Sequence, residues 1–289
     1  MNALLLILVV LGITAQHVTK KMYSQKQAGG AYTFSALSAL VAMIFFLITS
    51  GGSLEFTWAF VPHAIGFSIT YSLSIVFSFL AIKEGPLSLT SLITSYSLLI
   101  PSIYGLFAWD EPFSALLAVG ILILVVSIFL IQFEPKAEKS AEEVKRLTPK
   151  WIVYVSLAFI GGGGCSAFQK DQQLTFNGAY KNEFMIVALF ITFMAIMICA
   201  FCFEKKSVFE HAKRGVFTYG VCGAANGAVN YIVMVLSLRM HASVMFPIIS
   251  AGGILMAAIL SMTVYREKLS KLQKIGLALG ILAIIVLNI

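Results

Sequence analysis

The chain has 289 residues, of which 59% are hydrophobic and only 11% are charged, and its formal net charge is +7. A soluble domain carries about 25% Asp, Glu, Lys and Arg, so this chain has too few charges to cover a water-facing surface. Disorder is excluded because it requires low hydrophobicity and high charge. No soluble segment is long enough to carry a basic nucleic-acid-binding face. The composition therefore predicts an all-α integral membrane protein.

Ten apolar runs have the length of about 20 residues that a helix needs to cross a bilayer. In chain order, the predicted spans are Asn2–Thr19, Tyr32–Ser50, Trp58–Ile82, Pro86–Ala108, Pro112–Phe133, Trp151–Gln169, Ala179–Phe203, Val216–Leu238, Ala242–Tyr265 and Lys271–Leu287. The polar stretch Glu134–Lys150 divides them into five and five. We therefore expect a first five-helix repeat over residues 1–133, a polar linker over 134–150 and a second five-helix repeat over 151–289.

The distribution of basic residues predicts the orientation, because Lys and Arg in short loops tend to remain in the cytoplasm. The loops that follow the odd-numbered spans hold 17 of the 20 Lys and Arg residues, and the other side holds Lys170, Lys181 and Arg239. A multi-pass plasma-membrane protein is expected, with the linker in the cytoplasm and both termini outside.

Short matches between the two halves indicate an internal repeat. Gly30-Ala31-Tyr32 before the second span recurs as Gly178-Ala179-Tyr180 before the seventh. Asp110-Glu111-Pro112 near the end of the first half corresponds to Arg266-Glu267-Lys268 in the second, at an offset of 156 residues between the glutamates. Because five is odd, a repeated five-span unit must be inverted relative to its partner, as in many secondary transporters. The predicted fold is ten transmembrane helices in two inverted five-helix repeats.

These features resemble the drug/metabolite transporter superfamily, in its EamA-like branch. Each half closes with a glutamate-containing turn, Trp109–Pro112 (WDEP) or Tyr265–Gln273 (YREKLSKLQ), followed by a span that contains glycine. The resemblance covers essentially the whole chain. It implies alternating access through a central cavity lined by spans 1 to 4 and 6 to 9, with spans 5 and 10 outside. It also implies cytoplasmic termini, in disagreement with the charge count.

Polar residues inside the eighth span form one stripe. Gly223, Asn226, Gly227 and Asn230 follow the i, i+3, i+4, i+7 spacing of a single helix face, and Tyr231 borders them. Two interpretations are open. Small and amide side chains can serve helix packing, and polar side chains within a span can line a cavity.

The third and fourth spans supply further candidates. Thr70 and Ser74 correspond, at the offset of 156 residues, to Asn226 and Asn230, and Tyr71 lies beside them. A Ser or Thr hydroxyl can bond to its own helix, whereas a buried phenol needs a partner that a substrate can supply. The predicted substrate-binding residues are Thr70, Tyr71, Ser74, Ser95, Tyr96, Asn226, Asn230 and Tyr231.

Other positions suggest gates and hinges. Gln16 and His17 end the first span and Gln169 ends the sixth, so all three are predicted at the cavity mouths, with interfacial capping as the alternative. Prolines inside a span remove a backbone hydrogen bond, and a run of glycines is flexible. The predicted hinges are Pro101, Gly163 and Pro247.

The leading hypothesis is a secondary transporter, not an enzyme, that moves a small polar organic metabolite such as an amino acid, an amine or a sugar-like compound. No Asp or Glu lies in the middle of a span, which favours a neutral or zwitterionic substrate. No cofactor and no metal are expected. The partners are the lipid bilayer and the small-molecule substrate, while a coupling proton and the choice between monomer and weak homodimer stay open.

Two alternatives stay open, a second transport function and a function of another class. Efflux of lipophilic cations or drugs would rely on aromatic rings, which make up 12% of the residues. An integral-membrane enzyme acting on lipid-linked substrates would need clustered His, Asp or Glu, and the four histidines are scattered along the chain.

Overall fold

The computed structural model describes residues 2–27, 29–84, 90, 93–94, 96–112, 114–132, 148–263 and 271–287, and within these ranges it contains helices and no strand. The first half contains α1 (Asn2–Lys26), α2 (Ala31–Thr49), the short 3₁₀ helix η1 (Trp58–Phe60), α3 (Val61–Glu84), α5 (Leu99–Ala108) and α6 (Ala115–Gln132). The second half contains α7 (Pro149–Thr175), α8 (Lys181–Phe203), α9 (Ser207–Ser237), α10 (Ala242–Thr263) and α11 (Lys271–Leu287).

Helix length and surface composition suit a membrane. Among the described residues, six helices are long and apolar enough to cross a bilayer, namely α1, α2, η1 with α3, α7, α8 and α9. Shorter apolar helical segments lie at Leu99–Ala108, Ala118–Ser127, Ala242–Met256 and Lys274–Ala283. Large apolar side chains point outward, with Phe107 81% exposed and Phe217 72% exposed. Since such a surface is stable against lipid rather than water, the chain is a multi-pass membrane protein.

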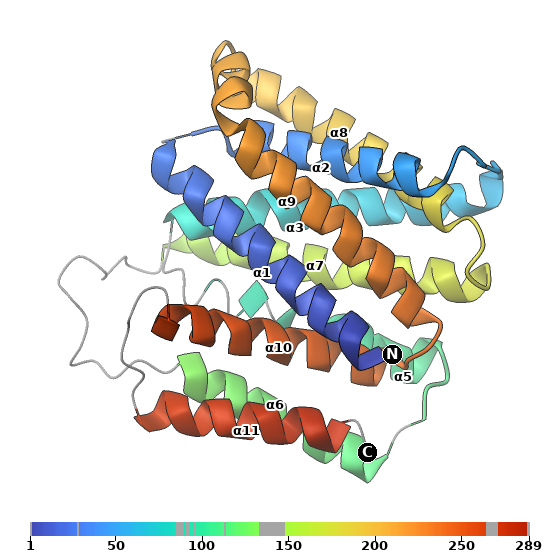
Figure 1. Cartoon of the computed structure of the whole chain (residues 1–289), viewed down its shortest axis with the longest axis vertical. Helices are drawn as coiled ribbons and strands as arrows, with labels where there is room; N and C mark the ends of the chain where they lie inside the picture. Colours follow the sequence, from blue (N-terminus) through green and yellow to red (C-terminus); the bar gives the residue numbers. More distant parts are fainter. Residues whose placement is uncertain are drawn as a thin grey trace.

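The helices run between two ends of the bundle (Figure 1). The chain begins and ends at the same end, on the right in Figure 1, which we call the termini end. The termini end also carries the connections at residues 50–57, 109–114, 176–180 and 238–241, and the opposite end, which we call the linker end, carries those at 27–30 and 204–206.

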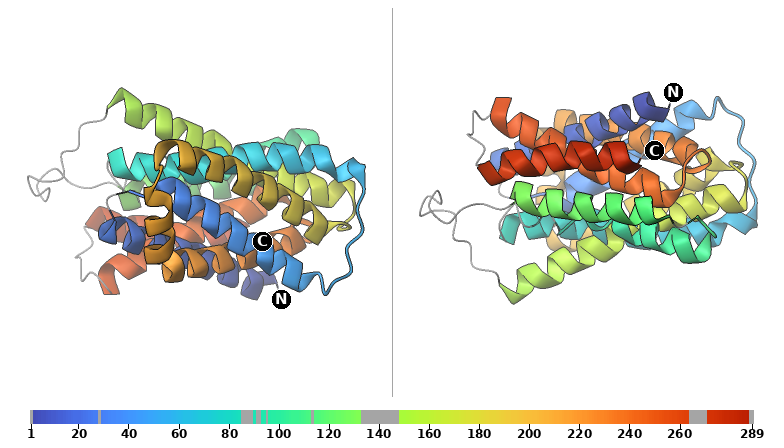
Figure 2. Two further views of the ribbon diagram at one scale, coloured as in Figure 1. Left: turned by 90° about the horizontal axis from the view of Figure 1, so that it is seen from above. Right: turned by 90° about the horizontal axis from the view of Figure 1, so that it is seen from below.

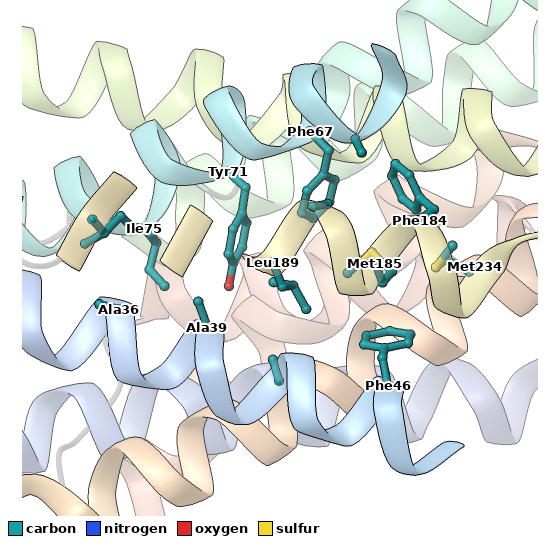
Figure 3. Close-up of a cluster of buried hydrophobic side chains, with 14 of the residues drawn as sticks. Ala36, Ala39, Phe46, Phe67, Tyr71, Ile75, Phe184, Met185, Leu189 and Met234 are labelled. Atoms are coloured by element: carbon teal, nitrogen blue, oxygen red, sulfur yellow. The ribbon is translucent and has the colours of Figure 1, made fainter. Parts of the chain in front are cut away.

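Helix pairs from opposite halves form most of the interior. α3 packs along α7, α1 and α2 both pack on α9, and α2 also packs on α8. α6 and α11 pack against each other at one edge of the bundle, the outer position that the family resemblance implies for spans 5 and 10 (Figure 2). A buried apolar cluster joins α2, α3 and α8, and within it Phe67 and Tyr71 project from α3 (Figure 3).

Three helices are longer than the hydrophobic pattern predicts. α1 continues past Thr19 to Lys26, and Tyr23 in this extension is buried against Phe34. α7 begins at Pro149 rather than Trp151, because the Thr148 hydroxyl accepts a hydrogen bond from the backbone N–H of Trp151 at 3.2 Å and a proline is favourable in a first turn. α7 also continues six residues past Gln169, because the polar residues that follow are buried and paired. α9 begins at Ser207 rather than Val216, with its first turns exposed to solvent.

The glycine run of α7 brings three helices into close contact. A Cβ atom added at Gly161 would lie 2.5 Å from the carbonyl oxygen of Thr70 and 2.6 Å from the backbone nitrogen of Ser74, both in α3. A Cβ atom at Gly163 would lie 2.4 Å from Cδ1 of Ile100 in α5. α7 is an uninterrupted helix here, so the run serves close helix packing in this structure.

We predict that Gly161→Ala destabilises the protein by roughly 1–3 kcal/mol, because the new methyl group forces the α3 backbone away from α7. The measurement is the melting temperature of the purified protein in detergent. Gly253→Ala is the matched control, because a Cβ atom there meets no atom of the described residues within 4 Å. Equal melting temperatures for the two variants would contradict the packing role of the run.

Candidate functional site

Four carboxamide side chains from α1, α7 and α9 form a hydrogen-bonded series, which we call the amide chain. The Gln169 side-chain nitrogen donates to Oδ1 of Asn230 at 3.1 Å, and the Asn230 side-chain nitrogen donates to Oδ1 of Asn226 at 3.0 Å. The Asn226 side-chain nitrogen donates to Oε1 of Gln16 at 3.1 Å. All donors point the same way along the series, so each inner amide is both donor and acceptor.

The amide chain is buried and its two ends are free. Gln169 is 3% exposed and Asn226 is 9% exposed, while Gln16 and Asn230 are half-buried. Buried amides are costly unless paired, which explains the continuous bonding. Among the described residues, the NH₂ group of Gln16 and the Oε1 atom of Gln169 make no hydrogen bond. A ligand would therefore meet a donor at one end of the chain and an acceptor at the other.

Tyr71 of α3 adds a phenol to this site. It is 9% exposed, its ring stacks on Phe67 with centroids 5.2 Å apart, and its hydroxyl lies near the Asn226 side chain. Figure 3 shows it pointing from α3 toward α2. The structure thus brings five predicted site residues together, namely Gln16, Tyr71, Gln169, Asn226 and Asn230.

Two other predicted residues of α3 lie against α7. Thr70 donates its hydroxyl to the carbonyl oxygen of Gly66 in its own helix at 2.8 Å, and its side chain contacts Gly164. Ser74 faces the same glycine run. Both residues contribute to the α3–α7 contact in this structure, and their substrate-binding roles stay predictions.

The remaining predicted contacts are dispersed. The Tyr96 hydroxyl donates to the carbonyl oxygen of Val125 in α6 at 3.4 Å. The Tyr231 ring lies beside Phe45 and Phe46 and 4.0 Å from the Lys181 ammonium nitrogen. Ser95 lies outside the described residues. Substrate binding by these three residues also stays a prediction.

The predicted gate and hinge residues differ in their surroundings. His17 follows Gln16 directly but is exposed. Pro101 is the third residue of α5, where a missing backbone N–H leaves no helical bond unmade. Pro247 lies inside α10, which continues through it. The gating role of His17 and the hinge roles of Pro101, Pro247 and Gly163 stay predictions.

A buried ion pair lies at the termini end, and sequence reasoning missed it. The Glu111 carboxylate accepts hydrogen bonds from the Lys170 ammonium at 2.8 Å and from the backbone N–H groups of Ala242 and Ser243 at 2.6 and 2.9 Å. Lys170 also donates to the carbonyl oxygen of Met240 at 3.0 Å. The Glu111 and Lys170 side chains are 3% and 2% exposed. Glu111 therefore caps the N-terminus of α10 and ties it to α7.

Asp171 extends this arrangement to α3. The indole nitrogen of Trp109 donates to one Asp171 carboxylate oxygen at 2.9 Å, and Nε2 of His63 lies 3.1 Å from the other. The Lys170 ammonium lies 5.3 Å from the centroid of the Trp109 ring. We call these residues, Glu111, Lys170, Asp171, Trp109 and His63, the Glu111 network.

The sequence held a signal for this network. Lys170 was expected as a loop charge, but it lies in α7 and is buried. The run Gln169–Gln173 (QKDQQ) directly continues an apolar helix, and such a run in a buried helix needs partners from elsewhere in the fold. The residues that supply these partners are set by where the α5–α6 connection and α10 lie in space, and no local sequence pattern gives those positions.

The surroundings of Glu111 lower its pKa. Burial by itself raises the pKa of a carboxyl group. The hydrogen bonds from Lys170 and from the backbone of Ser243 and Ala242 favour the charged form more strongly, so the pKa lies below its ordinary value of 4.5. Glu111 is therefore a carboxylate at neutral pH.

The structure is thus a multi-pass helical bundle with a series of paired amides between its two halves and a buried ion pair at one end. Residues 149–289 match the EamA-like transporter family. A solved structure described as "Crystal structure of protein" has a TM-score of 0.75 and 14% identity, covers 99% of this chain and 95% of that chain, and so shares the fold. The chain has no match among curated proteins.

The chain therefore carries an EamA-like transporter domain of the drug/metabolite transporter superfamily over residues 149–289. Members of this family are secondary transporters and not enzymes.

The lowered pKa of Glu111 predicts a pH-dependent contribution to stability. A carboxyl group with a lower pKa in the folded state stabilises it above the unfolded pKa, and the contribution is lost as the pH falls through the folded pKa. We expect Glu111→Gln to lower the melting temperature at pH 7, because it removes one partner of a buried pair at a cost of about 3–5 kcal/mol. The difference from the unsubstituted protein should shrink below pH 4.5.

Glu210→Gln is the control for this measurement. Glu210 pairs with Arg214 at 2.6 Å, but their side chains are 56% and 66% exposed, so solvent screens the pair. Melting temperatures of the two variants and of the unsubstituted protein should be recorded from about pH 2.5 to pH 8, so that the range extends well below the ordinary carboxyl pKa. A difference for Glu111→Gln that stayed constant over this range would contradict the expectation.

Proposed function

We propose that the protein moves a small polar organic metabolite, such as an amino acid, an amine or a sugar-like compound, by alternating access, and that the amide chain binds it. The observation that carries the proposal is that series of buried, uncharged amides with a free donor at one end and a free acceptor at the other. None of the four side chains that form the amide chain is charged, and this favours such a substrate over a lipophilic cation.

The energetics of the amide chain suit a transport site. A ligand with donors and acceptors replaces amide–amide bonds by amide–ligand bonds, and each bond contributes only about 0.5–1.5 kcal/mol net. Because the net change in free energy is small, ligand binding changes the populations of the protein's conformations without trapping the protein in one of them. Transport requires this, since the same site must both bind and release its ligand.

The pattern of helix contacts supports two inverted five-helix repeats, over residues 1–133 and 151–289 with a linker over 134–150. In that arrangement α1, α2, α3, α5 and α6 correspond to α7, α8, α9, α10 and α11. If each helix is replaced by its counterpart in the other half, the α1–α9 contact becomes the α7–α3 contact. In the same way α2–α9 becomes α8–α3, and α1–α10 becomes α7–α5. All six of these helix pairs are in contact. The pairs α2–α8, α5–α10 and α6–α11 map onto themselves. A pseudo-two-fold axis of this kind accompanies alternating access.

We predict that Asn226→Ala and Asn230→Ala each abolish transport while the protein stays folded, because either change interrupts the amide chain in its middle. A thermal-shift screen of purified protein against amino acids, amines and monosaccharides first identifies a ligand, since binding raises the melting temperature. Uptake of the radiolabelled ligand into proteoliposomes then measures transport.

Asn182→Ala is the matched control. It also removes a side-chain amide, but Asn182 only accepts a hydrogen bond from Thr49 at 3.4 Å at the termini end. The control should transport at the rate of the unsubstituted protein. Unchanged uptake by Asn226→Ala and Asn230→Ala would contradict the assignment, as would a screen in which only quaternary ammonium compounds bind.

The loop charges support external termini, with the linker end in the cytoplasm. The loops that follow the odd-numbered predicted spans hold 17 of the 20 Lys and Arg residues, and Lys170, one of the three on the opposite side, is buried in an ion pair. We predict that an epitope tag after Ile289 binds antibody on intact spheroplasts. A tag that binds only after permeabilisation would reverse the orientation and agree with the family expectation.

A further inference from the structure

We propose that the Glu111 network is the latch that closes the termini end of the transport pathway, and that Glu111 leaves Lys170 and the start of α10 when this end opens. The inference rests on the proposed function, because a latch has meaning only in a protein that opens. It assigns Glu111 and Lys170 a positioning role distinct from ligand binding at the amide chain.

The first argument is that one carboxylate holds three elements together. Glu111 belongs to the α5–α6 connection, Lys170 to α7, and Ala242 and Ser243 to the first turn of α10. One carboxylate oxygen accepts from Lys170 and Ala242, and the other accepts from Ser243. α7 and α10 cannot move away from this connection unless these bonds break together.

The second argument is the position of the latch relative to the site. Gln169 of the amide chain and Lys170 of the latch are consecutive residues of α7; Gln169 bonds to Asn230 of α9, and Lys170 bonds to Glu111 in the α5–α6 connection. A helix moves as a rigid element over one turn, so a displacement of α7 that a ligand causes at Gln169 also acts on Lys170. Ligand binding and release of the latch are thereby coupled through one segment.

The third argument comes from a comparison with the linker end. Glu204 caps α2 there, accepting from the backbone N–H groups of Tyr32 and Thr33 at 2.8 and 3.2 Å. Among the described residues, Glu204 forms no ion pair with a Lys or Arg, and it is half-buried. Glu204 and Glu111 thus each cap a helix, but among the described residues only Glu111 has a buried cation, Lys170, as a partner. Glu204 therefore provides a matched control.

The test measures thiol alkylation and needs no substrate. In a background with Ala at Cys165, Cys199, Cys202 and Cys222, Ser243→Cys places a thiol directly beneath Glu111. Ser243 is 1% exposed and its hydroxyl has no hydrogen-bond partner among the described residues, so cysteine fits there. The purified protein in detergent is treated with N-ethylmaleimide. Glu111→Gln and, separately, Lys170→Gln should raise the alkylation rate at least tenfold.

The control reporter is Ser35→Cys near the start of α2. Ser35 is also 1% exposed with an unpartnered hydroxyl in the described structure, but it lies at the linker end. Its rate should change less than twofold in Glu111→Gln. Conversely, Glu204→Gln should leave the rate of Ser243→Cys within twofold. This pair of results separates release of one latch from general loosening of the bundle.

A deeper reporter separates opening from local fraying of α10. The native Cys165, restored alone, lies one turn before Gln169 on α7 and is half-buried. Opening should raise its alkylation rate together with that of Ser243→Cys, whereas fraying of the first turn of α10 would raise only the latter.

The proposal is overturned by any of three results. They are an unchanged rate for Ser243→Cys in both latch variants, an equal increase for Ser35→Cys, or an increase that does not reach Cys165. Each variant is first checked for a monodisperse elution profile, and Lys170→Gln carries the test if Glu111→Gln does not fold. Because alkylation is independent of transport, a failed latch and a failed transport assignment give different results.

Discussion

Everything polar inside this bundle depends on one constraint, which is that a buried polar group without a partner is expensive. Water is absent from the hydrocarbon region, so carboxamides and charges there must pair with one another or with the backbone. The amide chain satisfies this constraint with neutral groups, and the Glu111 network satisfies it with a carboxylate, an ammonium and two helix N–H groups. Both features are therefore tightly connected, and both lie where helices of opposite halves meet.

The two features have different consequences because their bonds differ in strength. Neutral amide bonds contribute little net energy and exchange readily with a ligand. A buried ion pair is costly to break by removing one partner, so it suits a contact that is fully made or fully released. α7 carries one member of each, Gln169 and Lys170, and this adjacency is the route by which the proposed ligand binding would act on the proposed latch.

Much of the fold was predictable because a span of the membrane needs about 20 apolar residues in a row. The helices found here lie over the predicted spans, and the stripe of Asn226 and Asn230 faces the interior, as its spacing indicates. The prediction failed at the end of α1, at the ends of α7 and at the start of α9, where polar residues continue the helix. For α7 the reason is tertiary, since Lys170 and its neighbours are paired with residues that hydropathy does not reveal.

The sequence alone determined the helices, the polar face of α9 and the asymmetry of basic loops, because these follow from local periodicity and composition. The tertiary structure decided which polar groups meet. It joined Gln16 to Asn226, which are 210 positions apart, and Lys170 to Glu111, which are 59 positions apart, and it turned Thr70 and Ser74 toward glycines instead. The physical reason is that a hydrogen-bond partner is selected by distance in space, which only the packing of the helices sets.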